Sequence, residues 1–167
     1  MKNKHLVFSI FLMTGLSLFS QIPPTKPQNS VSYKTTSYNT AVFNAAYSKN
    51  YYDSTFTPSE DQIDKAEKAL SRDLRKLNKD LEHQNPRSPI DRILMKYNRQ
   101  YFGYINEDNH KILYINALHR DNDSTYIDQF FHKKITKIYG GISFWNVSYN
   151  ITENYLFDFN INSKLEE

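Results

Sequence analysis

The residues whose types and spacing suit a chemical role lie near the C-terminus, where polar and apolar side chains alternate. In residues 143–151 and again in 155–162 every second side chain is apolar, as in half-buried β-strands. The side chains between them combine an aromatic ring with amides, a hydroxyl and a carboxylate, which suits sugars, peptides or a protein partner. These candidate ligand-binding residues are Phe144, Asn146, Ser148, Asn150, Asp158 and Asn160. The alternative is an ordinary solvated face, because one face of an antiparallel sheet is normally wet and polar.

Patterns that would indicate catalysis, a metal or a cofactor are weak. Residues 121–125 offer oxygen ligands at alternating positions, but Tyr126 stands where a calcium loop has its turn glycine and His132 where it has its bidentate glutamate. There is no cysteine, no nucleophile motif and no glycine-rich phosphate loop. We therefore expect no catalytic residue, no metal and no cofactor, although carboxylates such as Asp158 and Asp128 could still meet in space.

The two alternating segments must be held by a sheet, and the sheet needs a covering helix. They predict an antiparallel hairpin with one apolar face, formed by Trp145, Val147, Tyr149, Ile151, Tyr155, Phe157, Phe159 and Ile161. The covering helix is predicted over 58–82, with Thr57 as N-cap, Pro58 at the first helical position and Glu60 completing a capping box. Its apolar stripe is Ile63, Ala66, Leu70, Leu74, Leu77 and Leu81.

Between this helix and the C-terminal hairpin the sequence predicts a second hairpin. Residues 101–106 and 111–118 are rich in Tyr, Phe and Ile and are separated by a polar turn. Residues 119–139 are ambiguous, because apolar side chains recur there at helical steps. We expect a short helical or irregular piece to about residue 132 and then a strand over 134–139, turning through Gly140 and Gly141 into the Trp145 strand.

The domain organisation follows from composition. Residues 1–20, with Lys2 and Lys4 before an apolar run, have the pattern of a cleaved signal peptide and are too short to span a membrane. Residues 21–56 are rich in Ser, Thr, Asn and Tyr and are expected to form a flexible leader, although the aromatic residues of 41–52 could instead dock on the domain or on a partner. A single domain is expected over 57–162, followed by a tail at 163–167.

Four motifs stand out together: residues 96–106 (KYNRQYFGYIN), Ile112 to Asn116, Gly140-Gly141 and Phe157 to Asn162. They resemble a group of small exported proteins of uncharacterised function from Bacteroidetes-type bacteria, and the resemblance extends over about 57–162. It implies a bacterial exported protein and an architecture, and carries over no catalytic residue.

The fold class expected is α+β, with one long N-terminal helix packed on a four- to five-stranded antiparallel sheet. Layering of this kind is found in cystatin-like and PepSY-like modules, by analogy of fold only. The first functional hypothesis is an exported, secreted or periplasmic, non-catalytic binding module with a protein or glycan partner. The alternatives are an inhibitor or immunity-type protein that binds a secreted toxin or protease, and a small-ligand binding protein or hydrolase with a pocket between helix and sheet. The net charge of +3 gives no reason to expect nucleic-acid binding.

Overall fold

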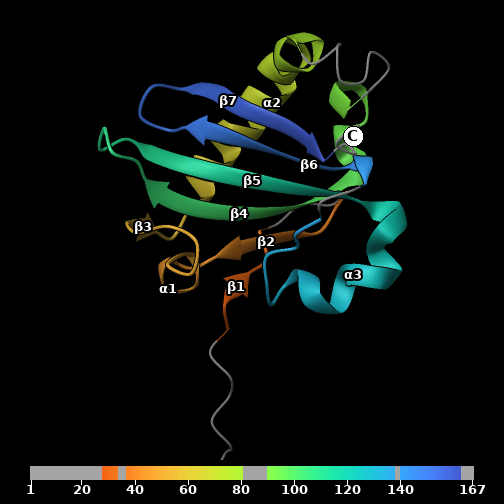
Figure 1. Ribbon diagram of the computed structural model, residues 1–167, viewed down its shortest axis with the longest axis horizontal. Helices are drawn as coiled ribbons and strands as arrows, with labels where there is room; N and C mark the ends of the chain where they lie inside the picture. The colour runs from red at the N-terminus through yellow and green to blue at the C-terminus, as the bar shows by residue number, and fades with distance from the viewer. Residues whose placement is uncertain (1–27, 34–36, 81–89, 138–139, 163–167) are drawn as a thin grey trace, which may run out of the picture.

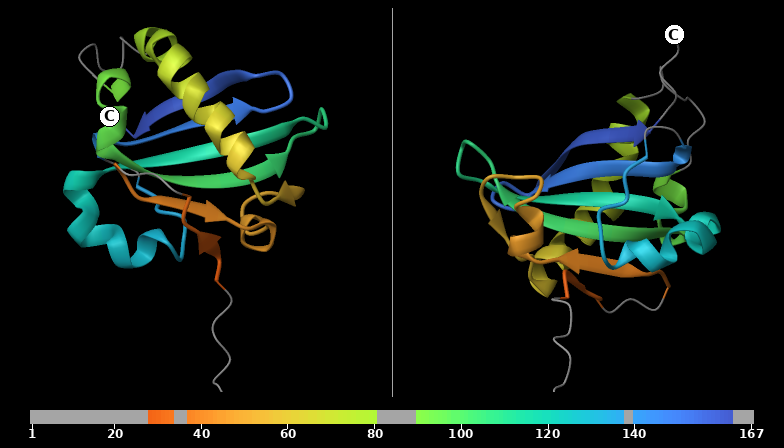
Figure 2. Two further views of the ribbon diagram at one scale, coloured as in Figure 1. Left: turned by 180° about the vertical axis from the view of Figure 1, so that it is seen from behind. Right: turned by 60° about the horizontal axis from the view of Figure 1, so that its bottom comes forward.

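The protein is an α+β fold in which one long helix, α2 (Glu60–Asp80), crosses one face of a sheet (Figure 1). The computed structural model describes residues 28–33, 37–80, 90–137 and 140–162. The expected signal peptide, residues 1–20, and the expected tail, 163–167, lie outside the described residues. Figure 2 shows α2 lying diagonally over the strands when the molecule is seen from behind. The predicted fold class is therefore confirmed.

The sheet has seven strands rather than the four or five expected. They are β1 (Ser30–Val31), β2 (Thr40–Phe43), β3 (Thr55–Phe56), β4 (Tyr97–Ile105), β5 (Lys111–His119), β6 (Gly141–Asn150) and β7 (Tyr155–Asn162). Their order is β1-β2-β4-β5-β6-β7, and β3 pairs with the free part of β4. All neighbours are antiparallel except β2 and β4, which are parallel. The four strands of the two predicted hairpins are present, and the N-terminal segment adds three.

This N-terminal contribution corrects the expected flexible leader over residues 21–56. In the described parts of that range, residues 28–33 and 37–56, the chain forms β1, β2, β3 and the short helix α1 (Ala45–Ser48). All four residues of β2 are buried. Val42 packs in the core under α2, whereas Ala41 and Phe43 pack on the opposite face of the sheet. The domain therefore begins well before residue 57, because β2 buries apolar side chains on both faces.

The start of α2 differs from the predicted cap by two residues. The backbone N–H of Gln62 donates to Ser59 Oγ (3.4 Å), and Gln62 Oε1 accepts from the backbone N–H of Ser59 (3.0 Å). This is a capping box two residues later than the one expected from Thr57 and Glu60. Thr57 Oγ1 instead accepts a hydrogen bond from the backbone N–H of Ala45 (2.9 Å). The hydroxyl that resembled a helix cap therefore fastens α1 to the domain.

The apolar stripe of α2 meets the sheet as predicted. Ile63, Ala66, Leu70 and Leu74 are buried against the sheet face that carries Trp145. Trp145 is 0% exposed and meets Tyr97 and Phe159 edge-on, with ring centroids 5.5 and 5.9 Å apart. Three further short helical turns complete the described chain: η1 (Ile90–Arg92), η2 (Leu94–Lys96) and η3 (Arg120–Asn122).

One ion pair is embedded in this core. Arg99 on β4 is 1% exposed, and its Nη1 lies 3.0 Å from Oε2 of Glu67 on α2. Glu67 also accepts hydrogen bonds from the hydroxyls of Tyr38 (3.0 Å) and Tyr101 (2.8 Å). The guanidinium group stacks over the Tyr38 ring at 4.1 Å. A carboxylate with three partners is adequately satisfied at the edge of a core, so this cluster ties residue 38 to both α2 and the sheet.

The predicted faces of the last strand are right in one half of β7 and wrong in the other. Phe159 and Ile161 belong to the core under α2, as expected, but Leu156 joins them while Tyr155 and Phe157 face the other way. The register between β6 and β7 shifts between Asn146 and Ser148, and Asp158 has a φ of 50°. This is a β-bulge, in which one extra residue reverses the alternation. A sequence pattern of strict period two cannot show where such a residue is inserted.

In residues 119–137 the expected short helical piece is present, whereas the strand expected after it is not. The chain forms α3 (Asp123–Phe130) and then continues through residues 131–137 without a strand. The strand expected over 134–139 is therefore absent from its described part, 134–137, and residues 138–139 lie outside the described residues. The turn at Gly140 and Gly141 has φ values of 153° and 53° and leads directly into β6. Phe130 and Ile135 of this region pack their side chains on the sheet face opposite α2, although the segment forms no strand of the sheet.

Candidate functional site

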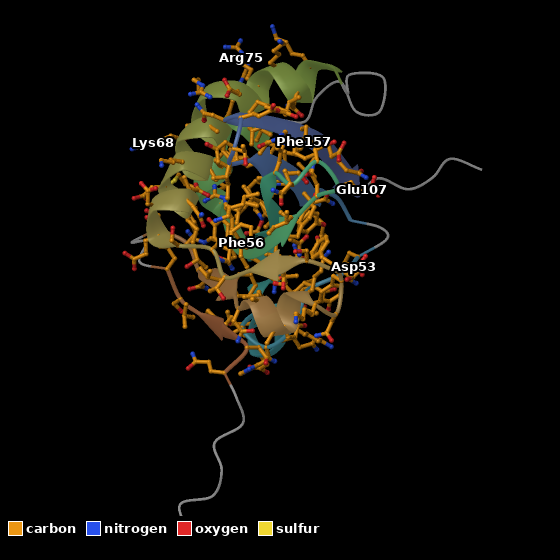
Figure 3. All side chains as sticks on the ribbon, turned by 90° about the vertical axis from the view of Figure 1, so that its left-hand side faces the viewer. Asp53, Phe56, Lys68, Arg75, Glu107 and Phe157 are labelled. Carbon is orange, nitrogen blue, oxygen red and sulfur yellow. The ribbon has the colours of Figure 1, made fainter. Side chains whose placement is uncertain are left out.

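The sheet face opposite α2, called the second face here, is covered over only part of its width. α1, α3 and segment 131–137 lie over β2, β4 and one end of β5, whereas none of the described helices lies over β6 and β7 on this side (Figures 1 and 2). The covered part holds a second core of Ala41, Phe43, Phe102, Leu118, Phe130, Ile135 and Phe144. Figure 3 shows Lys68 on α2 and Phe157 on β7 on opposite sides of the sheet.

A row of four amide side chains runs across the second face. The strand registers place Gln100 opposite Asn116, Asn116 opposite Asn146, and Asn146 opposite Asn160. Adjacent strands are about 4.8 Å apart, so each amide is a direct neighbour of the next. Gln100 and Asn116 are buried, Asn146 is half-buried and Asn160 is exposed. This amide row therefore begins in the second core and ends in solvent.

The buried end of the amide row holds segment 131–137 in place. Gln100 Nε2 donates to the carbonyl oxygens of Phe130 (2.7 Å) and Lys133 (2.7 Å), and its Oε1 accepts from the backbone N–H of Ile135 (2.9 Å). Asn116 Nδ2 donates to Gln100 Oε1 (2.9 Å) and to the carbonyl oxygen of Ile135 (2.8 Å). Buried backbone groups need such partners, because an unsatisfied one costs about 1–3 kcal/mol. The two amides therefore replace the strand pairing that this segment lacks.

An aromatic row lies beside the amide row on the same face. It consists of Phe102, Tyr114, Ser148 and Phe157, which are paired in register across β4, β5, β6 and β7. Residues two apart along a strand are about 7 Å apart, so the two rows are close neighbours. Tyr51 and Tyr52, which follow α1, extend the aromatic surface: Tyr51 meets Phe102 edge-on and Tyr52 stacks on Tyr104 at 4.3 Å. Burial raises the pKa of the Tyr114 hydroxyl to about 12, so it stays a neutral donor at physiological pH.

Lys134, at the middle of segment 131–137, points its ammonium group at this aromatic surface. Its Nζ lies 4.1 Å from the centroid of Tyr114, 5.0 Å from Tyr51, 5.6 Å from Phe102 and 5.7 Å from Tyr52. Burial lowers the pKa of this amine below its usual value of 10.5. Among the described residues no carboxylate lies within ion-pair distance of it.

These features meet in one open hollow of about 380 Å³. Its described lining residues are Tyr51, Tyr114, Asn116, Lys134, Ile135, Thr136, Lys137 and Asn146. Two of them are cationic and none is acidic. The hollow thus offers aromatic walls, amide donors and acceptors, and positive charge, which is the chemistry of a binding site for a polar and partly anionic ligand.

Of the six predicted site residues, Asn146 alone lines the hollow. Phe144 is buried in the second core against Tyr126, at 5.7 Å between ring centroids. Ser148 is buried within the aromatic row, whereas Asn160 is exposed at the open end of the amide row. The predicted residues therefore share a face, except for Asp158 at the bulge, but not a single pocket.

Asn150 and Asp158 lie away from the hollow, beside the β6–β7 turn and at the bulge. Asn150 is buried, and its Oδ1 accepts from the backbone N–H of Glu153 (2.9 Å) while its Nδ2 lies 3.2 Å from His110 Nδ1, so it shapes the turn between β6 and β7. Asp158 is exposed at the bulge. Polar residues at a turn or a bulge give the same alternating pattern as polar residues that bind a ligand. The sequence alone therefore does not distinguish these positions.

The hollow residues that the sequence reading missed come from three distant segments. Tyr51 lies in the expected leader, Tyr114 and Asn116 on the predicted hairpin, and Lys134 and Lys137 in the ambiguous region. One usable signal was present: the tyrosines of 47–52 are more numerous than a flexible spacer needs. No local pattern indicates that Lys134 would reach them.

The described part of the chain has two other regions of interest, the space under α2 and a hollow beside η3. The space between α2 and the sheet is filled by core side chains such as Leu74, Trp145 and Phe159. His119 and Asp121, whose Nδ1 and Oδ2 are 3.3 Å apart, line a separate hollow with Met95, Lys96 and Arg120. Within the described ranges no group of three or more His, Asp and Glu residues could hold a metal ion. In the same part of the chain no helix is both long and apolar enough to span a membrane.

No protein-family model matches the chain, and no curated protein or solved structure is significantly similar to it.

Proposed function

We propose that the protein is an exported, non-catalytic binding module that binds a glycan on the uncovered part of the second face. The observation that carries this proposal is the amide row running beside the aromatic row, with both reaching the hollow. A sugar ring has an apolar face that packs on aromatic rings and hydroxyls that need donors and acceptors together. Asn146 and Asn160 offer both functions next to Tyr114 and Phe157.

A binding role is favoured over hydrolysis by the residues of the hollow. Glycoside hydrolysis generally uses two carboxylates about 5–10 Å apart, and the described lining residues include none. Asp128 and His132 are exposed on α3 and segment 131–137, and neither lines the hollow. The hydrolase hypothesis also expected a pocket between helix and sheet, where the structure has core side chains.

Export is supported by the sequence alone. The first 20 residues combine two lysines with an apolar run, and the chain resembles small exported proteins of Bacteroidetes-type bacteria.

The inhibitor or immunity-type alternative is less well supported. A partner that adds a strand would use the exposed edge of β7, but the bulge at Asp158 interrupts the edge and places a charge there. Bulges and charges on edge strands are the usual means of preventing strand addition. Capture of one stoichiometric protein from the envelope or medium of the producing organism, with no glycan bound, would favour this alternative.

The test of the proposal is a glycan array probed with the purified full-length protein, followed by titration calorimetry with any saccharide that binds. Asn146→Ala and Phe157→Ala should each weaken binding about tenfold or more, because each removes a direct contact. Asn39→Ala is the matched control, since this exposed amide lies at the start of β2, away from the hollow. Failure of every saccharide to bind, or equal loss in the Asn39 variant, would overturn the proposal.

A further inference from the structure

Lys134 is a charged group that the fold holds beside the hollow without an anionic partner. Its ammonium group faces four aromatic rings, and in the described parts of the chain no carboxylate pairs with it. Cation–π contacts compensate only partly for the loss of hydration that burial imposes on a charge. A side chain that only had to cover Phe102 and Tyr114 would do so at lower cost as Met or Leu. The charge itself therefore calls for an explanation.

The position of Lys134 is built by dedicated contacts. The backbone N–H of Lys134 donates to the hydroxyl of Tyr47 (2.9 Å), and the carbonyl oxygen of Lys133 and both backbone groups of Ile135 are bound by the amides Gln100 and Asn116. Three consecutive residues of an irregular segment are thus fixed by two buried side chains, from β4 and β5, and by the half-buried Tyr47 of α1. Such contacts fix the direction in which the lysine leaves the backbone.

The other charged residue that lines the hollow is positive, as Lys134 is. Lys137 also lines it, and its Nζ lies 5.2 Å from the ring centroid of Tyr126. No acidic residue is among the described lining residues. An anionic group entering the hollow would therefore meet a desolvated ammonium group, with which it can form a strong charge-assisted hydrogen bond.

We infer that the glycan bound on the second face is acidic, and that its carboxylate or sulfate group lies against Lys134 in the hollow. This inference rests on the proposed function and adds the charge of the ligand to it. A uronic acid and a sulfated sugar share this chemistry, and the two sources are separated below by the choice of probes.

The experiment compares matched saccharides on the purified full-length protein by titration calorimetry. Oligogalacturonate carries charged carboxylates that are neutral methyl esters in its fully esterified form, and dextran sulfate and dextran differ in sulfation. Binding of at least one charged form should be about tenfold tighter or more than binding of its neutral form. Preference for oligogalacturonate identifies a carboxylate ligand, and preference for dextran sulfate identifies a sulfate ligand.

Lys134→Met tests whether this preference belongs to the proposed residue, because Met keeps the apolar stem over the rings and removes the charge. The preference should disappear in Lys134→Met and persist in Lys133→Met, the matched control, whose exposed side chain does not line the hollow. Lys134→Gln serves as a second variant, and thermal unfolding confirms that both variants are folded.

Each outcome decides the inference. Equal binding of charged and neutral forms by the unmodified protein would overturn the inference and leave glycan binding standing. Equal loss of preference in the Lys133 and Lys134 variants would overturn it as well, since it would indicate unspecific attraction between charges. Binding of none of these saccharides, and of no other on the array, would overturn both the inference and the proposed function.

Discussion

The two faces of the sheet are built from the same strands by different means. Under α2, one continuous helix covers the sheet with an apolar stripe, and Trp145 and Leu74 are completely buried. On the second face the cover comes from α1, α3 and segment 131–137, and it is fastened by the amides Gln100 and Asn116. The first arrangement gives stability through area removed from water, whereas the second leaves a hollow next to ordered polar groups. The first face is thus the main source of stability, and the second face is the one on which we propose that a ligand binds.

The largest effect should follow from damage to the face under α2. Trp145→Ala is expected to lower the free energy of unfolding by about 3–5 kcal/mol, because it leaves a cavity among Tyr97, Phe159 and the helix. A denaturant titration measures this loss. Phe157→Ala, on the half-open second face, is the comparison and should cost clearly less. A loss below about 1 kcal/mol for Trp145→Ala would contradict the division between the faces.

The second-largest effect on stability should follow from loss of the Gln100 hydrogen bonds that hold segment 131–137 on the second face. Gln100→Ala is expected to cost about 2–4 kcal/mol, because the carbonyl oxygens of Phe130 and Lys133 and the N–H of Ile135 lose their partner. It should also weaken glycan binding, since the hollow loses a fixed wall. Chemical unfolding and calorimetry measure the two effects. Gln129→Ala, an exposed amide on α3, should change neither, and a similar effect from both variants would contradict the role of Gln100.

A smaller effect is expected at the bulge of β7. Asp158 has a φ of 50°, which β-branched residues tolerate poorly, so Asp158→Val should cost about 1–2 kcal/mol. Asp158→Gly should be neutral or stabilising by up to about 1 kcal/mol. Thermal unfolding of the two variants, with Asn160→Val as the neighbouring control, distinguishes them. Greater stability of the valine variant would mean that the strand does not need the bulge to place Phe159 and Phe157 on opposite faces.

The smallest effect on stability is expected for Lys134→Met. Unlike Trp145→Ala and Gln100→Ala, it should raise the free energy of unfolding or leave it unchanged. Because the pKa of the buried amine is below its unfolded value of 10.5, the unfolded chain binds more protons between these two values. The charged amine therefore lowers the free energy of unfolding by its full amount below the folded pKa. This loss of stability disappears as the pH rises towards 10.5. Lys134→Met should be as stable as the unmodified protein or more stable at pH 7.

The advantage of Lys134→Met should shrink as pH rises through this window. Paired chemical unfolding curves at about pH 7.5 and pH 10 measure it. The neighbouring tyrosines are common to both proteins, so their ionisation cancels in the difference. A methionine variant that is clearly less stable at pH 7 would show that the charge serves the fold rather than a ligand.

How far the sequence predicts this molecule differs between the two faces. The stripe from Ile63 to Leu74 and the alternation around Trp145 are local patterns, and they correctly predict α2, four strands and the core between them. The second face depends on contacts between residues far apart, such as Tyr47 with Lys134 and Gln100 with Phe130. No periodicity reports such pairs. The polar strand residues were recognised as a face, but only Asn146 proved to line the hollow.

The errors have distinct physical causes. Segment 28–56 lacks periodicity because β2 is buried on both faces and is only four residues long, so it was predicted to be a leader. One inserted residue at Asp158 reversed the faces of Tyr155 and Phe157. Thr57 matched a helix cap, but its hydroxyl was used by Ala45. In each case the local sequence pattern was compatible with more than one structure, and contacts between distant residues determined which one forms.

The parallel pairing of β2 with β4 also constrains the order in which the chain can fold during synthesis. Thr40 emerges from the ribosome long before its partner Arg99, and α2 lies between them in the sequence. Until β4 is available, Ala41, Val42 and Phe43 have no sheet to join and remain open to chaperones and proteases. Such long-range pairing slows folding. Although β2 is made early, it is therefore expected to be among the last strands of this sheet to gain protection from hydrogen exchange.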